Sequence, residues 1–421
     1  MAMVSLLAAS LLVVQTDTVR LTSAEFLDQA LAAAPGVELA ELQADAARSR
    51  ADQTRAWANP QLSLQVDNYG AEREVTNIDG LAGLEAQAVF AFPLSVGGDR
   101  GARMRLGAAG ARGAEASLQL TRGDASVRAV AALASVRRDE AAFERAQDEV
   151  ETLTRLADAL ERQAELGRAP AGDAARARLA LAIALEALAL QQSELARSRA
   201  ELALVAGYDP FQAVEVVAGR CTTAALASEG DVSPVGDVPE VALAQAEEDL
   251  AQASLDLARA QRIPDLVPEL GVRRTMGTEA LYAGLSFNLP LFDRQGRSVD
   301  AARAEALGAA ASARDRTRAW QAEVLTATAT LRALSDAGRH FTSPEWGTDL
   351  DATVTAVETR WELGEGTLVE LLDGRRARFE ALAARDRWAA AWLIARARLA
   401  RLRGSAPDAS LFCDPFGSSA S

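Results

Sequence analysis

The chain has 421 residues, of which 49% are hydrophobic and only 5% aromatic, and its formal net charge is −15. Ala, Leu, Arg and Glu dominate, which excludes a disordered polymer and favours long helices packed through small side chains. The acidic balance argues against nucleic acid as a partner, and against adhesion to an anionic membrane surface, because both need clustered positive charge. Lysine is absent, so P-loop and Schiff-base lysine chemistry are excluded as well.

Side chains with catalytic or metal-binding chemistry are scarce. One histidine, His340, and two cysteines, Cys221 and Cys413, leave no material for a histidine or cysteine metal cluster, and we expect no cofactor. Both cysteines are interpreted as unpaired or structural thiols, bridged only if the fold brings them together. The sequence has no nucleophile elbow, HExxH or GxGxxG motif. We therefore do not expect an enzyme, and we expect His340 at the surface.

The N-terminal stretch from Met3 to Val14 is apolar and includes small residues. About twelve apolar residues suit the hydrophobic part of a secretory signal and are too few to span a bilayer as a helix. We predict a signal peptide over residues 1–16, without a lipid anchor because no cysteine follows it. The basic segment typical of such signals is missing, so a misplaced start or a buried helix is the alternative.

Helical and strand spacing alternate along the first half. The pattern is helical from 23 to 57, with Pro35 as the start of a second helix. Apolar and polar residues alternate over 61–67 and again over 84–92, which predicts a β-hairpin. Helix-compatible sequence then runs to Leu166, partly with a seven-residue apolar repeat. It predicts a coiled-coil-like helix of about 65 to 70 residues, or about 100 Å.

The same order of helices and strands occurs twice along the sequence. A turn at Gly167–Gly172 leads into a returning helix from Asp173 to about Val205, whose apolar run is interrupted by Glu186 and is interpreted as a packed amphipathic face. The second half again reads helix, hairpin, long helix, turn and helix, with a break near Gly338. Residues match at a constant offset of 197, namely Leu84, Phe90, Pro93, Glu165, Leu166 and Gly167 against Leu281, Phe287, Pro290, Glu362, Leu363 and Gly364. These matches predict internal duplication.

The predicted organisation is a signal peptide, two repeats, a linker between them and a tail, over residues 1–16, 17–208, 209–238, 239–404 and 405–421. Each strand has about ten residues, enough to span a bilayer when tilted. Two hairpins cannot close a barrel, and open strand edges in lipid leave backbone groups unpaired. Copies of the chain would therefore complete the barrel as a ring. A soluble hairpin packed on helices is the alternative.

Five segments carry a resemblance over nearly the whole chain: "NPQLSLQ", "FPLSVGGDRG", "RIPDL", "LSFNLPLFDRQGR" and "RWELGEGTLVELLDGRRAR". In this order the chain resembles the TolC family of outer-membrane efflux proteins, with its heavy-metal-efflux branch as a narrower possibility. The resemblance implies a mainly α fold with a small β part, in which a homotrimer builds a 12-stranded β-barrel and a hollow α-helical barrel.

The same resemblance implies a place and a function. The protein would lie in outer-membrane lipid with a large periplasmic part, as a passive exit duct for small solutes or ions. Its partners would be a periplasmic adaptor and an inner-membrane transporter. A duct for type I protein secretion and a soluble periplasmic coiled-coil adaptor are the alternatives.

By motif match, the helical-hairpin turns and the adaptor contact fall at Leu166, Gly167, Leu363, Gly364 and Gly366. The pore gate falls at Glu370, Asp373 and Asp173. Residues three apart share a helix face, so Glu370 and Asp373 of three copies could form a ring of six carboxylates that favours cations. The alternative is that Glu370 and Asp173 only stabilise the start of a helix.

The chain departs from the family pattern at Trp361, where a tyrosine is usual, at Gly366, where a basic residue is known, and at Pro170 in the first turn. The ion pairs that close the entrance in the family are therefore absent or rebuilt. The residues available to rebuild them include Arg168, Arg375 and Arg376.

Overall fold

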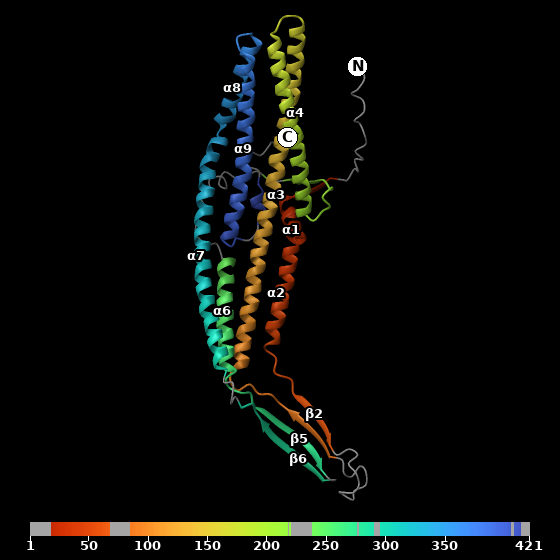
Figure 1. The fold of residues 1–421 in the computed structure, drawn as a ribbon, viewed down its shortest axis with the longest axis vertical. Coiled ribbons are helices and arrows are strands. Elements are labelled where there is room, and N and C mark those ends of the chain that lie inside the picture. The colour runs from red at the N-terminus through yellow and green to blue at the C-terminus, as the bar shows by residue number, and fades with distance from the viewer. Residues whose placement is uncertain are drawn as a thin grey trace. The chain divides into compact units, whose positions relative to one another are not determined.

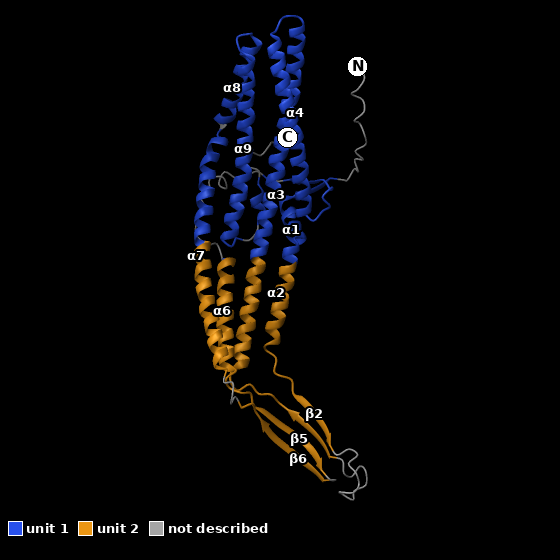
Figure 2. Ribbon diagram, viewed as in Figure 1, with its two compact units in different colours: residues 1–38, 120–238, 321–421 blue, residues 39–119, 239–320 orange. Residues whose placement is uncertain are grey.

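A computed structural model describes residues 18–67, 85–217, 219, 238–275, 278–289, 295–405 and 408–413 (Figure 1). The predicted signal peptide, Cys221, and Leu84 and Pro290 of the repeat matches lie outside these residues. The chain divides into two compact units (Figure 2). The first comprises residues 1–38, 120–238 and 321–421, and the second comprises residues 39–119 and 239–320. Each unit therefore takes residues from both halves of the sequence.

The predicted helices form. They are α1 (Ser23–Ala33), α2 (Pro35–Gln53), α3 (Asp99–Glu165), α4 (Ala171–Val205), α6 (Pro239–Ala260), α7 (Gly296–Phe341), α8 (Pro344–Glu362) and α9 (Leu368–Leu402), with a short 3-10 helix η1 (Ala409–Phe412). At 67 residues, α3 has the predicted length. Pro170 caps α4, which begins two residues before the predicted Asp173.

The predicted break in the second long helix separates α7 from α8. Ser343 caps α8, its side chain accepting a hydrogen bond from the Trp346 N–H, and Pro344 occupies the first helical position. Proline lacks an N–H and disfavours a helical residue before it, so the helix ends and restarts here. His340, near the end of α7, is exposed as expected.

Four antiparallel strands form one sheet in the second unit, in the order β2 (Gln61–Asp67), β3 (Glu85–Ala91), β5 (Val267–Thr275) and β6 (Thr278–Ser286). The register aligns Leu64 with Ala88, Val272 and Leu281 across the sheet, and Gln65 with Gln87, Arg273 and Ala280 in the next row. Because side chains alternate between faces, one face is mainly apolar, with Arg274 and Glu279 at its end, and the other carries most of the polar side chains. The strands have seven or nine residues, slightly fewer than predicted.

A second, parallel pair joins β1 (Val19–Thr22) to β4 (Val214–Val217) in the first unit. This pair was not predicted from the sequence, and β4 lies in the predicted linker, residues 209–238. Each strand has only four residues with two-residue alternation, a signal too short to separate from loop. An ion pair between Arg20 and Glu215, at 2.9 Å, joins the two strands.

The backbone repeats at the offset found in the sequence. Six described residues have a positive φ, in the left-handed region of the backbone. They form three pairs separated by 197 positions: Gly98 and Gln295, Gly167 and Gly364, and Gly207 and Gly404. Helices α4 and α9 begin and end at the same offset. The two halves therefore turn at equivalent positions.

Cys413 is disulfide-bonded. The preferred interpretation of both cysteines as unpaired or structural thiols is therefore wrong for Cys413. The other cysteine of the chain lies outside the described residues. Around Cys413, Phe412 packs edge-on against Phe26 of α1 with ring centroids 5.7 Å apart. Burial lowers the pKa of the neighbouring Arg396 guanidinium, which donates to the Ser410 carbonyl oxygen at 3.0 Å. The end of the described chain is thus fastened to α1 and α9.

Replacing Gly364 with alanine should destabilise the protein. Gly364 has φ +73°, and a Cβ added to it would meet no atom within 4 Å, so the cost is backbone strain alone, about 1–2 kcal/mol. Thermal unfolding followed by circular dichroism should show a lower melting temperature. Gly172→Ala is the matched control, since Gly172 also has open space but lies in a helix without positive φ. Equal melting temperatures for the two variants would contradict this account.

Candidate functional site

The two predicted turns have the same geometry. At the first, the Gly167 N–H donates to the Ala164 carbonyl at 3.0 Å, and the Arg168 N–H donates to the Gln163 carbonyl at 2.8 Å. At the second, Gly364 and Glu365 make the equivalent bonds, at 3.0 and 2.8 Å. This pattern satisfies the last carbonyls of a helix and needs a left-handed residue, usually glycine.

The residues around these glycines are exposed at the turn or packed closely within it. Leu166 and Leu363, one before each glycine, are 67% and 68% exposed. Gly366 serves close approach, because a Cβ there would lie 3.1 Å from the Trp361 backbone nitrogen. A side chain at 366 would therefore crowd the backbone at the end of α8.

Glu370 forms part of the N-terminal cap of α9. The Thr367 hydroxyl accepts from the Glu370 N–H at 3.3 Å, and the Glu370 carboxylate accepts from the Thr367 N–H at 3.0 Å. Arg360 lies 3.7 Å from the same carboxylate. This is the helix-start role that the sequence left open, and it holds the carboxylate at the turn.

The other two acids differ in their surroundings. Asp173, at the matching position of α4, is 3.6 Å from Arg176, which stands where the second repeat has Asp373. Asp373 itself is exposed on the second turn of α9, close along the helix to Glu370. The structure thus brings Glu370 and Asp373 to one exposed stretch of α9, whereas Asp173 pairs locally.

The two turns belong to helical hairpins that pack together. Ala157 and Leu160 of α3, Ala174 and Ala177 of α4, and Leu368 and Leu371 of α9 form one buried cluster. Val357 and Trp361 of α8 pack against it. Trp361, which departs from the family tyrosine, therefore fills space between the hairpins.

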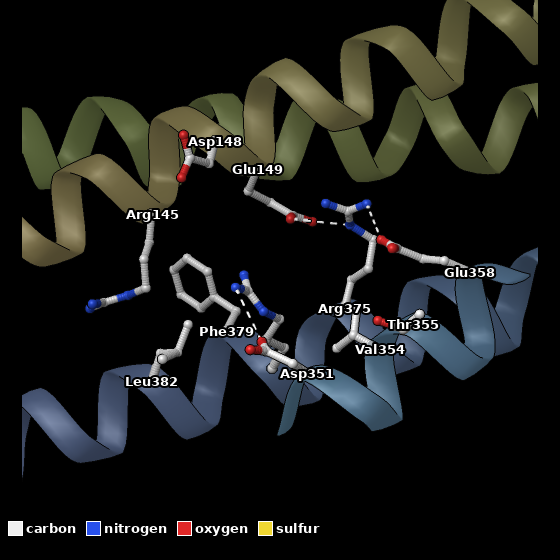
Figure 3. Close-up of a pocket in the computed structure, with 11 residues that line it drawn as sticks. Arg145, Asp148, Glu149, Asp351, Val354, Thr355, Glu358, Arg375, Phe379 and Leu382 are labelled. Atoms are coloured by element: carbon white, nitrogen blue, oxygen red, sulfur yellow. Dashed lines mark hydrogen bonds and ion pairs between the residues drawn. The ribbon is translucent and has the colours of Figure 1, made fainter. Parts of the chain in front are cut away.

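Each hairpin contains an ion pair between its own two helices at equivalent positions. Arg178 of α4 lies 3.1 Å from Glu161 of α3, and Arg375 of α9 lies 3.0 Å from Glu358 of α8, at the same offset of 197. Only Arg375 extends further, to Glu149 of α3 at 3.5 Å (Figure 3). Arg375 therefore bridges the two hairpins. Of the arginines proposed for rebuilt ion pairs, Arg376 pairs with Glu380 on its own helix instead.

A charged cavity surrounds this bridge (Figure 3). It has a volume of about 250 Å³ and lies between α3, α8 and α9. Arg145 of α3 pairs with buried Asp386 of α9, and Arg378 lies 4.0 Å from Asp351 of α8. Arg145, Glu149 and Asp386 were not predicted from the sequence, because their partners are more than 200 positions away and no local motif marks them.

The apolar run of α4 packs with one face only: Leu181 lies against the buried cluster between the hairpins, as expected of an amphipathic helix, and the other face is exposed. Leu179, Ile183 and Leu190 are between 59% and 64% exposed. Among the described residues, α4 is also a helix long and apolar enough to cross a membrane by length and composition, with 6% of its most apolar window buried.

Comparison with known proteins settles the family. The family model described as outer membrane efflux protein matches residues 26–208 and 237–405, which is most of the chain. The chain belongs to this family. The efflux protein is thus an outer-membrane channel and not an enzyme, as the sequence predicted, and of the alternatives the soluble adaptor is overturned.

Three relatives illustrate the similarity. Nickel-cobalt-cadmium resistance protein NccC of Alcaligenes xylosoxydans xylosoxydans is 28% identical over 309 residues, 70% of this chain and 68% of NccC. Nickel and cobalt resistance protein CnrC of Cupriavidus metallidurans is 29% identical over 287 residues, 66% of this chain and 65% of CnrC. The crystal structure of the outer membrane protein VceC from Vibrio cholerae has a TM-score of 0.75 at 18% identity, covering 92% of this chain and 97% of VceC.

Thr367→Ala should weaken the start of α9 in the efflux protein. The change removes the hydroxyl that accepts from the Glu370 N–H, which typically costs about 1 kcal/mol. The melting temperature should fall, while Thr367→Ser, which keeps a capping hydroxyl, should melt like the unaltered protein. If the alanine and serine variants melt together, the cap does not contribute to stability.

Proposed function

We propose that the efflux protein is a homotrimeric exit duct that releases small solutes or ions across the outer membrane. The observation that carries this proposal is the four-stranded sheet, with one mainly apolar face and two outer strands, β2 and β6, at its edges. Three copies of four strands supply twelve, enough to close a barrel without an edge. Residues 17–208 and 239–404 are proposed as the two duplicated repeats of each copy.

The face of the sheet that meets lipid is proposed from its side chains. Leu64, Val272 and Leu281 lie in one row and are exposed in the single chain. Exposed apolar rows on a sheet are unfavourable in water and favourable against acyl chains. The opposite row, with Gln65, Gln87 and Arg273, has the polarity of a water-filled lumen.

We propose divalent metal cations as the cargo of the duct, because the relatives NccC and CnrC are named as nickel and cobalt resistance proteins. In this proposal the protein works as a passive duct with a periplasmic adaptor and an inner-membrane transporter, and the transporter selects the ion. Leu166 and Leu363 are the proposed adaptor contacts, because they are large, apolar and exposed at the turns.

Subcellular fractionation and a resistance assay test the duct together. The protein should be found in the outer-membrane fraction as an oligomer that dissociates on heating. Deletion of the gene should lower tolerance to nickel, cobalt or cadmium, and reintroduction should restore it. A soluble monomer would overturn the duct, whereas an outer-membrane oligomer without any metal phenotype would overturn only the proposed cargo.

Leu64→Arg should impair assembly far more than the neighbouring Gln65→Arg. An arginine on the lipid face of a membrane strand costs roughly 2–4 kcal/mol near the bilayer midplane, and less near its borders. Gln65 lies on the other face, where a charge stays hydrated. The yield of heat-resistant oligomer in the membrane fraction is the measurement. Equal yields for the two variants would mean that the faces are assigned wrongly.

Glu370→Gln with Asp373→Asn should reduce the cation preference of the pore. Six carboxylates would be removed from three copies, while glutamine at 370 can still complete the N-terminal cap. Single-channel recordings under a salt gradient measure the reversal potential. Asp336→Asn, at an exposed acid of α7, is the control. An unchanged reversal potential would leave Glu370 and Asp373 as helix-start and surface residues.

A further inference from the structure

The polar face of the four-stranded sheet carries more negative than positive charge. In the described strands its charged residues are Asp67, Glu85, Glu269 and Arg273. Arg273 lies 3.6 Å from Glu85, and it is four residues further along β5 than Glu269. The one arginine on this face of the described strands is therefore already paired, and the charge of Glu269 is left uncompensated.

Neutral hydroxyl groups hold both carboxylate oxygens of Glu269. The Tyr282 hydroxyl donates to Oε2 at 2.9 Å, and the Ser286 hydroxyl donates to Oε1 at 2.8 Å. Within the part of the chain that the structure describes, Glu269 takes part in no ion pair. Hydrogen bonds from neutral donors stabilise and orient a carboxylate without cancelling its charge.

Gly284 makes this arrangement possible. It is paired with Glu269 across β5 and β6, and on β6 it lies between Tyr282 and Ser286 on the same face. A Cβ at position 284 would lie 2.5 Å from the Tyr282 hydroxyl oxygen, so the phenol group occupies the space that a side chain would need. Tyr282 therefore lies across Gly284 to reach Glu269.

The other residues in the row of Glu269 are small or uncharged. Across the sheet, Glu269 is aligned with Ala91 of β3, and Ala91 is aligned with Gln61 of β2. Glu269 itself is half-buried. A carboxylate that is held in place, partly exposed and without a positive neighbour in its row attracts cations that pass this face of the sheet.

We propose that Glu269 is a selectivity-determining residue of the duct, which favours cations in the lumen of the barrel. Three copies of the chain form a ring of three such carboxylates, each held by its own Tyr282 and Ser286. The proposal rests on the proposed function, in which the polar face of the sheet faces the lumen. The ring is distinct from the carboxylates of Glu370 and Asp373, which belong to the other compact unit.

Coulomb's law gives the size of the effect. A unit charge roughly 10 Å from a monovalent cation in water raises the local concentration of that cation about twofold, and that of a divalent cation about fourfold, when salt does not screen it. The screening length is about 30 Å in 0.01 M salt and about 10 Å in 0.1 M salt. The contribution of Glu269 should therefore be largest in dilute salt and for divalent cations.

Single-channel recordings of the full-length protein in planar lipid bilayers test the proposal. A KCl gradient between about 0.1 M and about 0.01 M gives a reversal potential, and from it the ratio of cation to anion permeability. Glu269→Gln should lower this ratio about twofold, because glutamine keeps the size of the side chain and one acceptor oxygen but removes the charge. The difference should shrink in about 1 M KCl, where the screening length is about 3 Å.

Glu279→Gln is the matched control. Glu279 lies on β6 of the same sheet, at the end of the mainly apolar face, so removing its charge should leave the ratio unchanged. Glu269→Asp keeps the charge and should retain the cation preference. The yield of heat-dissociable oligomer is measured for each variant, so that an effect on assembly is separated from an effect on permeation.

Tyr282→Phe tests whether Tyr282 positions the carboxylate. Phenylalanine keeps a ring over Gly284 but cannot donate to Glu269. The permeability ratio should fall by less than in Glu269→Gln, because the charge remains but is no longer held in one place. In the Glu269→Gln background the same change should leave the ratio unaltered. A merely structural role of Tyr282 would instead lower the oligomer yield in both backgrounds without changing the ratio.

Two results would overturn the proposal. One is a conducting oligomer whose permeability ratio in dilute salt is the same for Glu269→Gln as for the unaltered protein. The other is an equal fall of the ratio for Glu269→Gln and Glu279→Gln. In both cases the duct stands and Glu269 has no part in its selectivity. If the protein forms no conducting oligomer, the proposed function fails and this proposal fails with it.

Discussion

Backbone hydrogen bonding in the sheet is the constraint on which the rest of the protein depends. Strands β2 and β6 each have one neighbour, so the outer edge of each presents unpaired N–H and C=O groups. In the hydrocarbon of a membrane such groups cost several kcal/mol each, and in water they invite aggregation. In the proposed duct, strands of other copies would pair with these two edges and leave no backbone group unpaired in the membrane.

Small side chains allow the helices to form long, close pairs. Three of the six residues of the buried cluster between the hairpins are alanines. At Gly338 the absence of a side chain allows a close approach, because a Cβ there would lie 2.1 Å from the Trp388 ring. Trp388 in turn donates its indole N–H to the Leu334 carbonyl at 2.6 Å. Trp392, one turn further along α9, donates its indole N–H to the Ser335 hydroxyl at 3.3 Å, so both tryptophans face a small residue of α7.

Much of the fold could be predicted from local signals. The two glycine turns, the hairpins and the length of α3 follow from periodicity and from residues that tolerate left-handed backbone. The pairing of β1 with β4 could not be predicted, because four-residue strands nearly 200 positions apart have no local signature. The ion pair between Arg375 and Glu149 could not be predicted from the sequence either, since an arginine on a long helix has many candidate carboxylates. For Glu370, the sequence allowed a cap or a gate, and the structure shows the cap while leaving the gate to experiment.

The interruption between α7 and α8 has a mechanical consequence. An unbroken helix such as α3 bends only by small changes spread over many hydrogen bonds, and it therefore resists a sharp change of direction. Between Phe341 and Pro344, by contrast, a few backbone dihedrals can absorb a change of direction. Each chain thus combines one unbroken helix with one interrupted helical run of the same residue count, and a change of direction costs fewer hydrogen bonds in the interrupted run than in α3.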